Sequence, residues 1–458
     1  MNERLPSFSA PLLAALRQRL HGDTLLPTDA GYALARRVWN AAIDRHPGAI
    51  VVCADAEDVA LALQIAAEHR VEVTVRGGGH NVAGRSIADG ALLLDLSRMR
   101  NVTVNAAARI ATVQGGAQWH DVDVATARQS MATTGGLISS TGVGGFTLGG
   151  GSGWLMRRHG LAIDNLLAVG IVLADGRAVR ASAEDHPELF WGIRGGGGGL
   201  GVVTSFEFQL HPLRQVLAGV VIRPLTEAAT ALRTFRDYAA QAADSFCGMV
   251  IIAHAPSLPF LDAAWHGQPV VVTAVCWCGD IATGQQALTP LREFGSPLAD
   301  HVGPMPYVQW QHLQDPGAPP GRYYYWKTAS YVALSDATIN VLCAHGERLP
   351  SRQSEIHVQH MGGAVARIAA DDTAFAQRDT QFFVNLLGIA AWADEFPRLR
   401  ANVRELHEQI APLAVPGMLP NFSGQDDGDP VGSFDTSHAT RLAALRRRYD
   451  SSSIFVRG

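Results

Sequence analysis

VRGGGHNVAG (75–84) contains three consecutive glycines that run directly into a histidine, and this stretch indicates which kind of fold to expect. Glycine loses more backbone freedom on folding than any other residue, so such a run is costly within a helix or a strand. The run becomes favourable where the backbone must bend sharply or where a ligand approaches it closely. The preceding VEVTVR (71–76) alternates as a strand does. The sequence therefore predicts a glycine loop after a strand, closed by His80.

Two further glycine-rich stretches, TGVGGFTLGGGSGWLMRRHGLAIDNL (141–166) and RGGGGGLGVVT (194–204), lie in the same half of the chain. Backbone N–H groups in such turns form nests for phosphate oxygens. Tight turns alone would explain any one stretch, but three together favour a bound anion, and a diphosphate fits best. No P-loop lysine follows the glycines, so the pattern favours a held cofactor over a nucleoside triphosphate substrate.

Gly196, Gly198 and Gly201 match the G-x-G-x-x-G pattern of dinucleotide-binding folds. Those folds need a strand before the motif and a helix after it. Here HPELFWGIR (186–194) predicts a helix before the motif, and VVTSFEFQL (202–210) predicts a strand after it. Because the order is reversed, the motif is not a Rossmann fingerprint.

Composition places the 458-residue chain among globular proteins, with 47% hydrophobic and 17% charged residues. The net charge is −5, and the basic run RLAALRRRYD (441–450) has the spacing of a solvated helix face, so we expect no nucleic-acid partner. No apolar run reaches the roughly 18 residues of a membrane span, and the N-terminus makes a poor signal peptide. We therefore expect no membrane partner and a cytoplasmic location.

The cysteines do not form a recognisable framework. There are five, an odd number, at the scattered positions 53, 247, 276, 278 and 343. This spacing predicts reduced thiols rather than disulfides. No second histidine, cysteine or carboxylate stands at ligand spacing from His80, so we expect no metal.

The pattern of strands and helices predicts an α+β fold with a change of domain near 212–216. The first half has strand patterns at 49–54, 71–76, 90–97 and 109–116, and helix patterns at 56–70 and 118–131. The second half has strand patterns at 217–224, 247–254, 269–279, 323–332 and 354–363, and helix patterns at 226–242, 283–294, through 373–411 and at 436–450. Strands in series with intervening helices predict an antiparallel sheet that helices cover on one face.

Four stretches together resemble a known family. They are VRGGGHNVAGRS (75–86), GGLISSTGVGGFTLGGGSGWLMRRHGLAIDNLL (135–167), HPELFWGIRGGGGGLGVVTSFEF (186–208) and RLAALRRRYDSSSIF (441–455). These stretches resemble the vanillyl-alcohol-oxidase (PCMH-type) superfamily of FAD-linked oxidases, in its berberine-bridge-enzyme-like branch. The resemblance implies a PCMH-type FAD-binding domain at 1–212, a substrate-binding domain at 213–415 and a C-terminal segment, 416–458, that returns to the FAD domain.

The resemblance also implies the cofactor and its contacts. FAD would be covalent, with its 8α-methyl group bonded to His80, while Gly77, Gly78 and Gly79 wrap the pyrophosphate. The implied cofactor-binding residues are Arg76, Gly77, Gly78, Gly79, His80, Asn81, Ser86, Thr141, Gly142, Gly144, Gly145, Gly150, Gly153, Asn165, Gly201, Val203 and Asn421.

The chain departs from the family pattern at three places. Many members carry a second anchoring cysteine at the position of Ile138, and no cysteine lies between 54 and 246. Phe146 stands where plant members have a histidine, and Leu419 stands where many members have a tyrosine. The chain thus resembles the single-histidine bacterial type, which includes hydroxynicotine oxidase and the enterocin-type polyketide-tailoring flavoenzymes.

Two strand patterns carry the candidate catalytic residues. In SEIHVQH (354–360), Glu355, His357 and Gln359 share one face of a strand. In RYYYWKT (322–328), Tyr325 and Lys327 share a face. A carboxylate suits general-base work, a phenol could bind or deprotonate a hydroxyl, and the choice of base among Glu355, Tyr325 and Lys327 stays open. Without a catalytic role, the polar face of 354–360 would be explained by a solvent-facing strand edge, and the aromatic strand 322–328 by ordinary core packing.

These inferences predict an FAD-dependent oxidase or oxygenase. It would oxidise an alcohol, an amine or an activated C–H of a small organic metabolite, with molecular oxygen as electron acceptor. The alternatives are a flavin dehydrogenase with another acceptor and a flavin-binding protein without turnover. The expected partners are a small-molecule substrate and oxygen, and a homodimer stays open.

Overall fold

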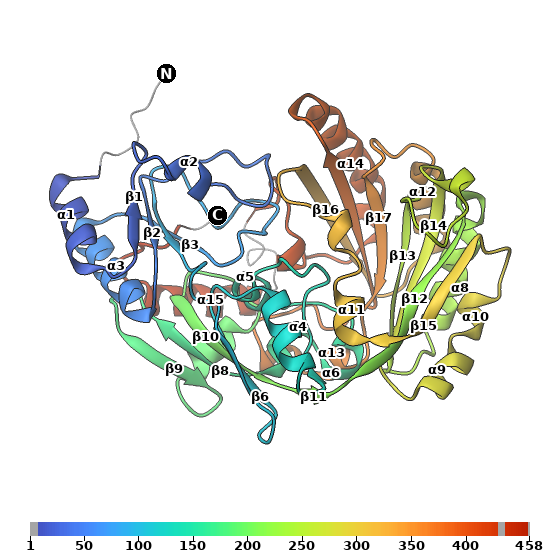
Figure 1. The fold of residues 1–458 in the computed structure, drawn as a ribbon, viewed down its shortest axis with the longest axis horizontal. Coiled ribbons are helices and arrows are strands. Elements are labelled where there is room, and N and C mark those ends of the chain that lie inside the picture. The colour runs from blue at the N-terminus through green and yellow to red at the C-terminus, as the bar shows by residue number, and fades with distance from the viewer. Residues whose placement is uncertain (1–7, 429–435, 457–458) are drawn as a thin grey trace.

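The computed structural model describes residues 8–428 and 436–456. Figure 1 shows two parts side by side, with the N-terminal half (blue to green) on the left and a large sheet (yellow to orange) on the right. The first part is built on two sheets, and the second on one sheet of seven strands. The α+β class predicted from the sequence is confirmed.

The first sheet has the order β1-β2-β4-β3, and β2, β4 and β3 run parallel. Its elements are β1 (Asp23–Leu25), β2 (Ala49–Val52), β3 (Val73–Arg76) and β4 (Leu92–Asp95), with helices α1 (Ala10–Arg19) and α3 (Ala56–His69). Its parallel strands are almost continuously apolar, as strands buried on both faces must be. The Asp55 carboxylate caps α3 by accepting hydrogen bonds from the N–H groups of Glu57 and Asp58.

The second sheet is antiparallel, in the order β5-β6-β10-β8-β9. Its strands are β5 (Val102–Asn105), β6 (Ile110–Gln114), β8 (Leu166–Val172), β9 (Ala178–Ser182) and β10 (Val202–Gln209). Helices α4 (Trp119–Ala127), α7 (Pro187–Ile193) and α15 (Thr436–Tyr449) accompany it. Because α7 precedes the glycine run and β10 follows it, the predicted reversal of the Rossmann order is confirmed.

The C-terminal segment lies against the first part. Helix α15 packs on α7, where Leu442 and Leu445 are buried in the core of the second sheet. Phe455 forms a parallel bridge with Val73, beside the first sheet. Val73 and Phe455 lie near opposite ends of the sequence, so the contact is tertiary.

The third sheet is fully antiparallel, in the order β15-β12-β14-β13-β17-β18-β16. Its strands are β12 (Gln215–Pro224), β13 (Phe246–His254), β14 (Pro269–Trp277), β15 (Ala299–Pro306), β16 (Tyr323–Tyr331), β17 (Glu355–His360) and β18 (Phe382–Ala390). Helices α8 (Ala228–Ala239), α9 (Ile281–Ala287), α10 (Thr289–Arg292), α12 (Asp336–Gly346) and α14 (Phe396–Ile410) pack with it. The expected antiparallel sheet covered by helices is confirmed.

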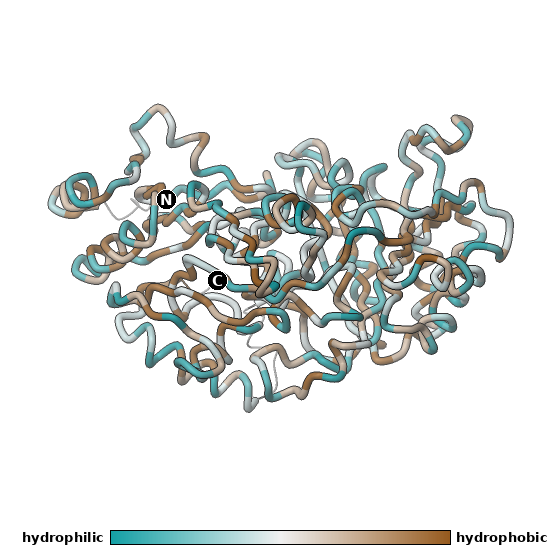
Figure 2. Tube along the Cα trace, turned by 60° about the horizontal axis from the view of Figure 1, so that its bottom comes forward, coloured by the Kyte–Doolittle hydropathy of each residue, from teal (hydrophilic) through white to brown (hydrophobic). Residues whose placement is uncertain are grey.

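Helices cover one face of this sheet, and the other face meets the first part. The largest apolar core lies under the helices and includes Phe235, Phe246 and Leu406. Figure 2 shows hydrophobic positions (brown) along many inner segments of the chain, whereas much of the teal lies on the outer turns. The uncovered face is therefore free to line a site between the two parts.

Short elements complete the fold. They are α2 (Tyr32–Ala35), α5 (Val143–Leu148), α6 (Met156–His159), α11 (Tyr307–Gln311), α13 (Ala364–Arg367), β7 (Met131–Ala132) and β11 (His211–Pro212). Within the described ranges, the helices are too short or too polar to cross a membrane.

Two strands correct the sequence-based expectations. The stretch 373–411, predicted as helical, contains β18, which lies between β17 and β16 in the third sheet. Every residue of β18 is buried, so its sequence FFVNLLGIA lacks the alternation that marks a half-exposed strand. Strand β15 carries glycine and two prolines, and it lies at a sheet edge, where proline is tolerated.

Candidate functional site

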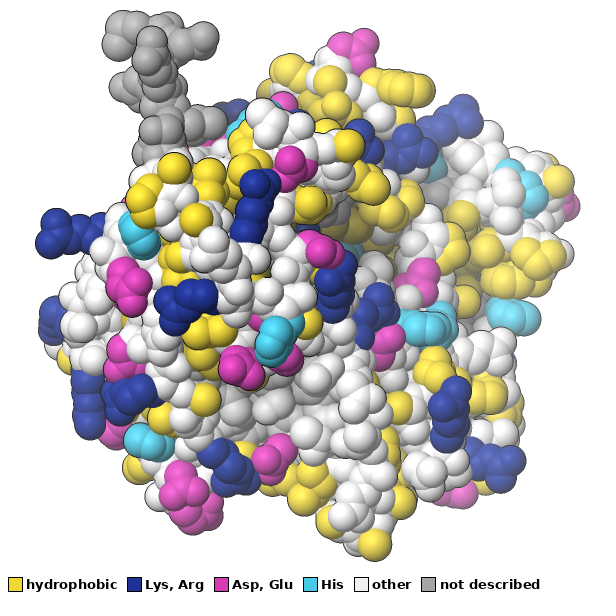
Figure 3. All heavy atoms as spheres, turned by 60° about the vertical axis from the view of Figure 1, so that its left-hand side comes forward, with side chains coloured by type: hydrophobic (Ala, Val, Ile, Leu, Met, Phe, Trp, Pro, Cys, Tyr) yellow, Lys and Arg dark blue, Asp and Glu magenta, His cyan; other side chains and the backbone are white. Residues whose placement is uncertain are grey.

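A cavity of about 1120 Å³ lies between the glycine loops and the third sheet. Its walls include the loops 77–81, 141–149 and 197–201 on one side and residues of β13, β16, β17 and β18 on the other. Figure 3 shows the surface hollowed between the two parts, with hydrophobic side chains on the walls and basic side chains at the edges. A volume of this size is enough for a dinucleotide and a small second molecule.

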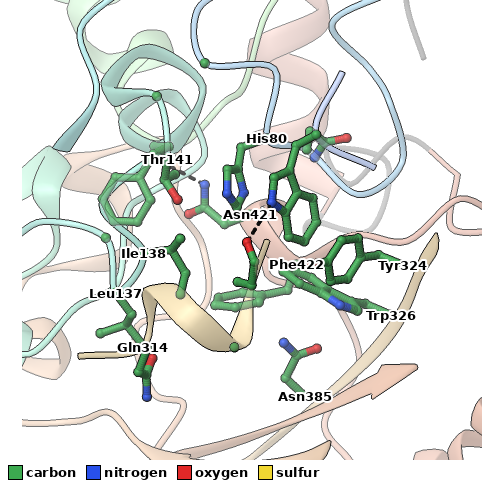
Figure 4. A pocket seen from close by; sticks show the side chains of 18 of the residues that line it. His80, Leu137, Ile138, Thr141, Gln314, Tyr324, Trp326, Asn385, Asn421 and Phe422 are labelled. Carbon is green, nitrogen blue, oxygen red and sulfur yellow. Dashed lines mark hydrogen bonds between the residues drawn. The ribbon is translucent and has the colours of Figure 1, made fainter. Parts of the chain in front are cut away.

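His80 projects into this cavity from the end of the first glycine loop. Its imidazole stacks on Trp39, with 4.2 Å between ring centroids, and its Nε2 lies 3.2 Å from the Ser140 hydroxyl. Trp39 stacks in turn on Tyr324 of β16, with centroids 3.6 Å apart. Burial lowers the pKa of His80 to about 4, so the ring is neutral near pH 7 and keeps a nucleophilic nitrogen. Figure 4 shows His80, Ile138 and Asn385 around one space.

The first two glycine loops contact each other through their backbones. A Cβ on Gly78 would lie 2.4 Å from the amide nitrogen of Gly142, and a Cβ on Gly142 would lie 2.2 Å from that of Gly78. Neither residue can therefore carry a side chain without moving the other loop. Gly79 has a φ of +63°, which favours glycine for a second reason.

Other glycines leave space for a ligand rather than for the protein. A Cβ on Gly145, Gly197 or Gly198 would meet no protein atom within 4 Å, and all three residues line the cavity. Side chains at these three positions would fill space in the cavity that a ligand could occupy. The Ser86 hydroxyl, which also lines the cavity, is buried without a hydrogen-bond partner in the described structure. The backbone N–H groups of these glycines and the unpaired Ser86 hydroxyl are suitable hydrogen-bond donors for a diphosphate. These donors therefore fit FAD.

Asn421 joins the C-terminal segment to the second glycine loop. Its Nδ2 donates to the Phe146 carbonyl at 2.9 Å, and its Oδ1 accepts from the Gly151 N–H at 2.8 Å. The side chain therefore holds the backbone of the loop in place. This gives Asn421 a structural role at the site beside its predicted cofactor contact.

Most of the predicted cofactor-binding residues line the cavity. These are Gly77, Gly78, Gly79, His80, Asn81, Ser86, Thr141, Gly142, Gly144, Gly145, Gly201, Val203 and Asn421. Arg76, Gly150, Gly153 and Asn165 do not line it. Arg76 pairs with buried Asp95 at 2.6 Å, and Asn165 donates to the carbonyls of His159 and Leu161. The side chains of Arg76 and Asn165 are therefore bonded to other protein atoms.

Two of the three positions that depart from the family pattern line the cavity, and Leu419 does not. Ile138 and Phe146 are both among its lining residues, and no cysteine of the described chain is. Cys247, Cys276 and Cys278 are buried in an apolar cluster, where desolvation raises their pKa values. No cysteine of the described residues is therefore placed to attach a ligand in this cavity.

Glu355 and His357 form a hydrogen-bonded pair on the cavity face of β17. His357 Nε2 lies 2.6 Å from the Glu355 carboxylate, so that nitrogen donates its proton and Nδ1 is left as an acceptor. Asn385, the register partner of His357 on β18, lines the cavity beside it. Gln359 is buried farther along β17 and does not line the cavity.

Tyr325 and Lys327 lie on the opposite face of the sheet, which corrects the expectation that they face the reacting centre. Tyr325 is fully buried in the core under the helices, and its hydroxyl donates to Asp426 at 2.5 Å. Lys327 forms an ion pair with Asp427. The residues that alternate with them on the strand, Tyr324 and Trp326, line the cavity instead.

Sequence reasoning missed Trp39, Asn385 and Trp326 as cavity residues. Trp39 lies in a segment without periodic pattern, yet its backbone N–H donates to the Gly79 carbonyl at 3.1 Å. Asn385 is the one polar residue in the apolar run FFVNLLGIA, and that isolated amide was an available signal. One group of residues that could hold a metal ion, His21, Asp55 and Asp58, occurs in the described ranges. Its carboxylates already accept hydrogen bonds from backbone N–H groups, and its residues lie outside the cavity lining.

Comparison with known proteins agrees with this geometry. A family model described as an FAD binding domain matches residues 47–182. The (R)-6-hydroxynicotine oxidase of Paenarthrobacter nicotinovorans is 31% identical over 457 residues, which cover 95% of each chain. An FAD-linked oxidoreductase of Dictyostelium discoideum is 28% identical over 420 residues, covering 91% of this chain and 89% of the relative.

Solved structures show the same architecture. The crystal structure of 6-hydroxy-D-nicotine oxidase from Arthrobacter nicotinovorans matches with a TM-score of 0.85 at 26% identity, covering 98% of both chains. A glucooligosaccharide oxidase of Acremonium strictum, described with a 6-S-cysteinyl, 8α-N1-histidyl FAD, matches in fold with a TM-score of 0.83 at 22% identity, covering 97% of this chain and 98% of that one. With its glycine-lined cavity and these relatives, the chain is an enzyme and belongs to the FAD-linked oxidoreductases of the PCMH-type superfamily, in the berberine-bridge-enzyme-like branch.

Proposed function

We propose that this enzyme is an oxidase that carries FAD on His80 and oxidises an alcohol, an amine or an activated C–H of a small organic molecule, with oxygen as acceptor. One observation carries the proposal. A single cavity connects the glycine loops and His80 to the Glu355–His357 pair on the third sheet. A cofactor site and a proton-accepting site in one enclosure are what such a reaction needs.

His80 supplies the attachment point. Its ring is neutral at physiological pH because burial lowers its pKa to about 4, so one of its nitrogens is available to form a bond. The Ser140 hydroxyl at 3.2 Å from Nε2 and the stacked indole of Trp39 hold the ring in one orientation. The glucooligosaccharide oxidase of Acremonium strictum, with its 6-S-cysteinyl, 8α-N1-histidyl FAD, supports this assignment by analogy.

The Glu355–His357 pair supplies the proton acceptor. Bound FAD would take up the electrons of the substrate and pass them to oxygen, so the protein must remove the accompanying proton. The Glu355 carboxylate can accept that proton directly, or it can hold the His357 ring so that Nδ1 accepts it. Glu355 and His357 are therefore the proposed catalytic residues, and Asn385 beside them is placed to donate a hydrogen bond to a substrate oxygen or nitrogen.

Acid precipitation of the purified protein tests the attachment. We expect yellow colour in the washed pellet for the wild type and its loss from the pellet for His80→Ala. His69→Ala, at the exposed end of α3, is the matched control and should keep the colour in the pellet. Colour in the wild-type supernatant would refute the covalent bond, and a colourless protein would refute the flavin assignment.

Oxygen consumption and peroxide release over a panel of alcohols, amines and phenols then test the reaction. Turnover under air with peroxide formation would support an oxidase. Turnover that needs an artificial acceptor and leaves oxygen untouched would replace the oxidase proposal with a dehydrogenase.

A further inference from the structure

Arginine and histidine side chains line the cavity at one end of three neighbouring strands of the third sheet, β14, β13 and β17. Glu355 is the one acidic side chain among the described lining residues, and it is already bonded to His357. Arg352, in the turn before β17, lines the cavity together with His254 at the end of β13 and His266 just before β14.

Arg352 has no partner in the described part of the protein. The side chain is exposed, and its guanidinium makes neither an ion pair nor a hydrogen bond there. The side chain passes over Gly267, since a Cβ on that residue would lie 3.3 Å from Arg352 Nη1. An arginine fork offers five N–H donors in a plane and matches a carboxylate with two parallel hydrogen bonds.

The pKa of His254 reflects burial and the positive charge of Arg352. Burial lowers its pKa, and the charge of Arg352 lowers it further, which places the two side chains near each other. Because its pKa is lowered, the His254 imidazole does not readily add a second positive charge beside Arg352. The Nδ1 atom of His254 is also buried without a hydrogen-bond partner among the described residues.

We propose that Arg352 binds a carboxylate at one end of the substrate, so that this enzyme acts on organic acids whose oxidised carbon lies at the opposite end. The inference rests on the proposed function, because it assigns Glu355 and His357 to the reacting end. Arg352 lies three residues before Glu355, a separation of at most about 10 Å along the backbone. The cavity wall in this region includes Ile251, Leu258 and Phe260, which would contact an apolar body between the two ends.

Isothermal titration calorimetry with a matched pair of probes tests this subsite. The probes are 4-phenylbutanoate and 4-phenylbutanamide, which share shape and differ in charge. We expect the wild-type holoenzyme to bind the acid at least tenfold more tightly than the amide. Arg352→Gln should remove this preference and leave amide binding unchanged. Arg348→Gln, an exposed arginine outside the cavity lining, should keep the preference.

The outcomes separate this inference from the proposed function. Equal affinities for acid and amide, no binding of the acid, or an undiminished preference in Arg352→Gln would each overturn the carboxylate subsite. The flavin content of the same samples is read from the visible spectrum. If the enzyme carries flavin but shows no preference for the acid, only the carboxylate subsite is refuted. If the protein is colourless but still prefers the acid through Arg352, the subsite is supported and the oxidase proposal is refuted.

Discussion

The indole of Trp39 stacks on the imidazole of His80, with ring centroids 4.2 Å apart and planes inclined by 19°. The same indole stacks on Tyr324, and its Nε1 donates to the Ala318 carbonyl at 3.0 Å. Trp39 thus connects the first glycine loop to the third sheet through one side chain. Its position sets the orientation of the proposed attachment residue.

Replacing Trp39 should therefore slow flavin attachment. Aromatic stacking contributes about 0.5–1.5 kcal/mol, so we expect Trp39→Leu to lower the rate of covalent incorporation by roughly 2- to 10-fold. The flavin fluorescence of the denatured protein band, measured over time after FAD is added to unloaded protein, gives this rate. Trp39→Phe should restore much of it, and Trp392→Leu, at an exposed site with 69% of the side chain accessible, should match the wild type. Equal rates for Trp39→Leu and the wild type would contradict a positioning role.

Replacing Glu355 with glutamine should reduce turnover while the flavin stays bound. General-base catalysis contributes about 10²- to 10⁴-fold, and the amide cannot accept the proton. Glu355→Gln keeps the shape of the side chain and its ability to accept a hydrogen bond from His357. We expect kcat to fall by about two orders of magnitude or more, measured as oxygen consumption per bound flavin. The control Glu347→Gln lies at the exposed end of α12, and unchanged kcat in Glu355→Gln would remove this residue from the mechanism.

Two glycines of the site should respond differently to alanine. In Gly78→Ala, the new Cβ would lie 2.4 Å from the Gly142 nitrogen, so the two loops must separate, at a cost of about 1–3 kcal/mol in stability. In Gly145→Ala, the Cβ meets no protein atom and a glycine leaves helix α5, so stability should not fall. Flavin binding should weaken in both variants. Thermal unfolding of unloaded protein and FAD titration measure the two effects separately, and Gly303→Ala, with open space and no cavity contact, serves as control. Full flavin binding by Gly145→Ala would contradict its place in the cradle.

Buried neutral histidines should make the fold sensitive to acid. His360 is 2% exposed, its Nε2 accepts a hydrogen bond from Arg157 at 2.9 Å, and burial lowers its pKa to about 3. In the unfolded chain, histidine binds a proton near pH 6.5, so below this pH the unfolded state holds more protons and the stability falls as the pH falls. Between pH 6 and pH 4, one such group contributes a slope of up to about 1.4 kcal/mol per pH unit.

Urea unfolding at pH 7, 6, 5 and 4 measures this slope. His360→Gln cannot titrate and keeps an acceptor for Arg157, so its stability should fall less steeply with decreasing pH than that of the wild type. His69→Gln, at the exposed end of α3, should keep the wild-type slope. Parallel curves for His360→Gln and the wild type would show that His360 does not titrate differently in the folded state.

Local patterns in the sequence determined the fold class and the cofactor family. The glycine stretches, His80 and the missing second cysteine are local features, because a glycine run or a residue type at Ile138 can be read without knowing what lies nearby. The order of helix, glycine run and strand around 195–201 could also be predicted from the sequence. The spacing of apolar residues within each element indicates its type without knowledge of its neighbours. Backbone geometry agrees with this local reading at Gly79, where φ is +63°.

Tertiary packing, by contrast, determines which side chains meet at the site. Alternation placed Tyr325 and Lys327 on one face of β16 and Tyr324 and Trp326 on the other, but it could not tell which face the helices would cover. Strand β18 was missed because both of its faces are buried, and it brings Asn385 beside His357. The contacts of Trp39 with His80 and Tyr324 join segments up to 285 positions apart. Such contacts depend on how whole sheets pack, and no periodicity within one element encodes that packing.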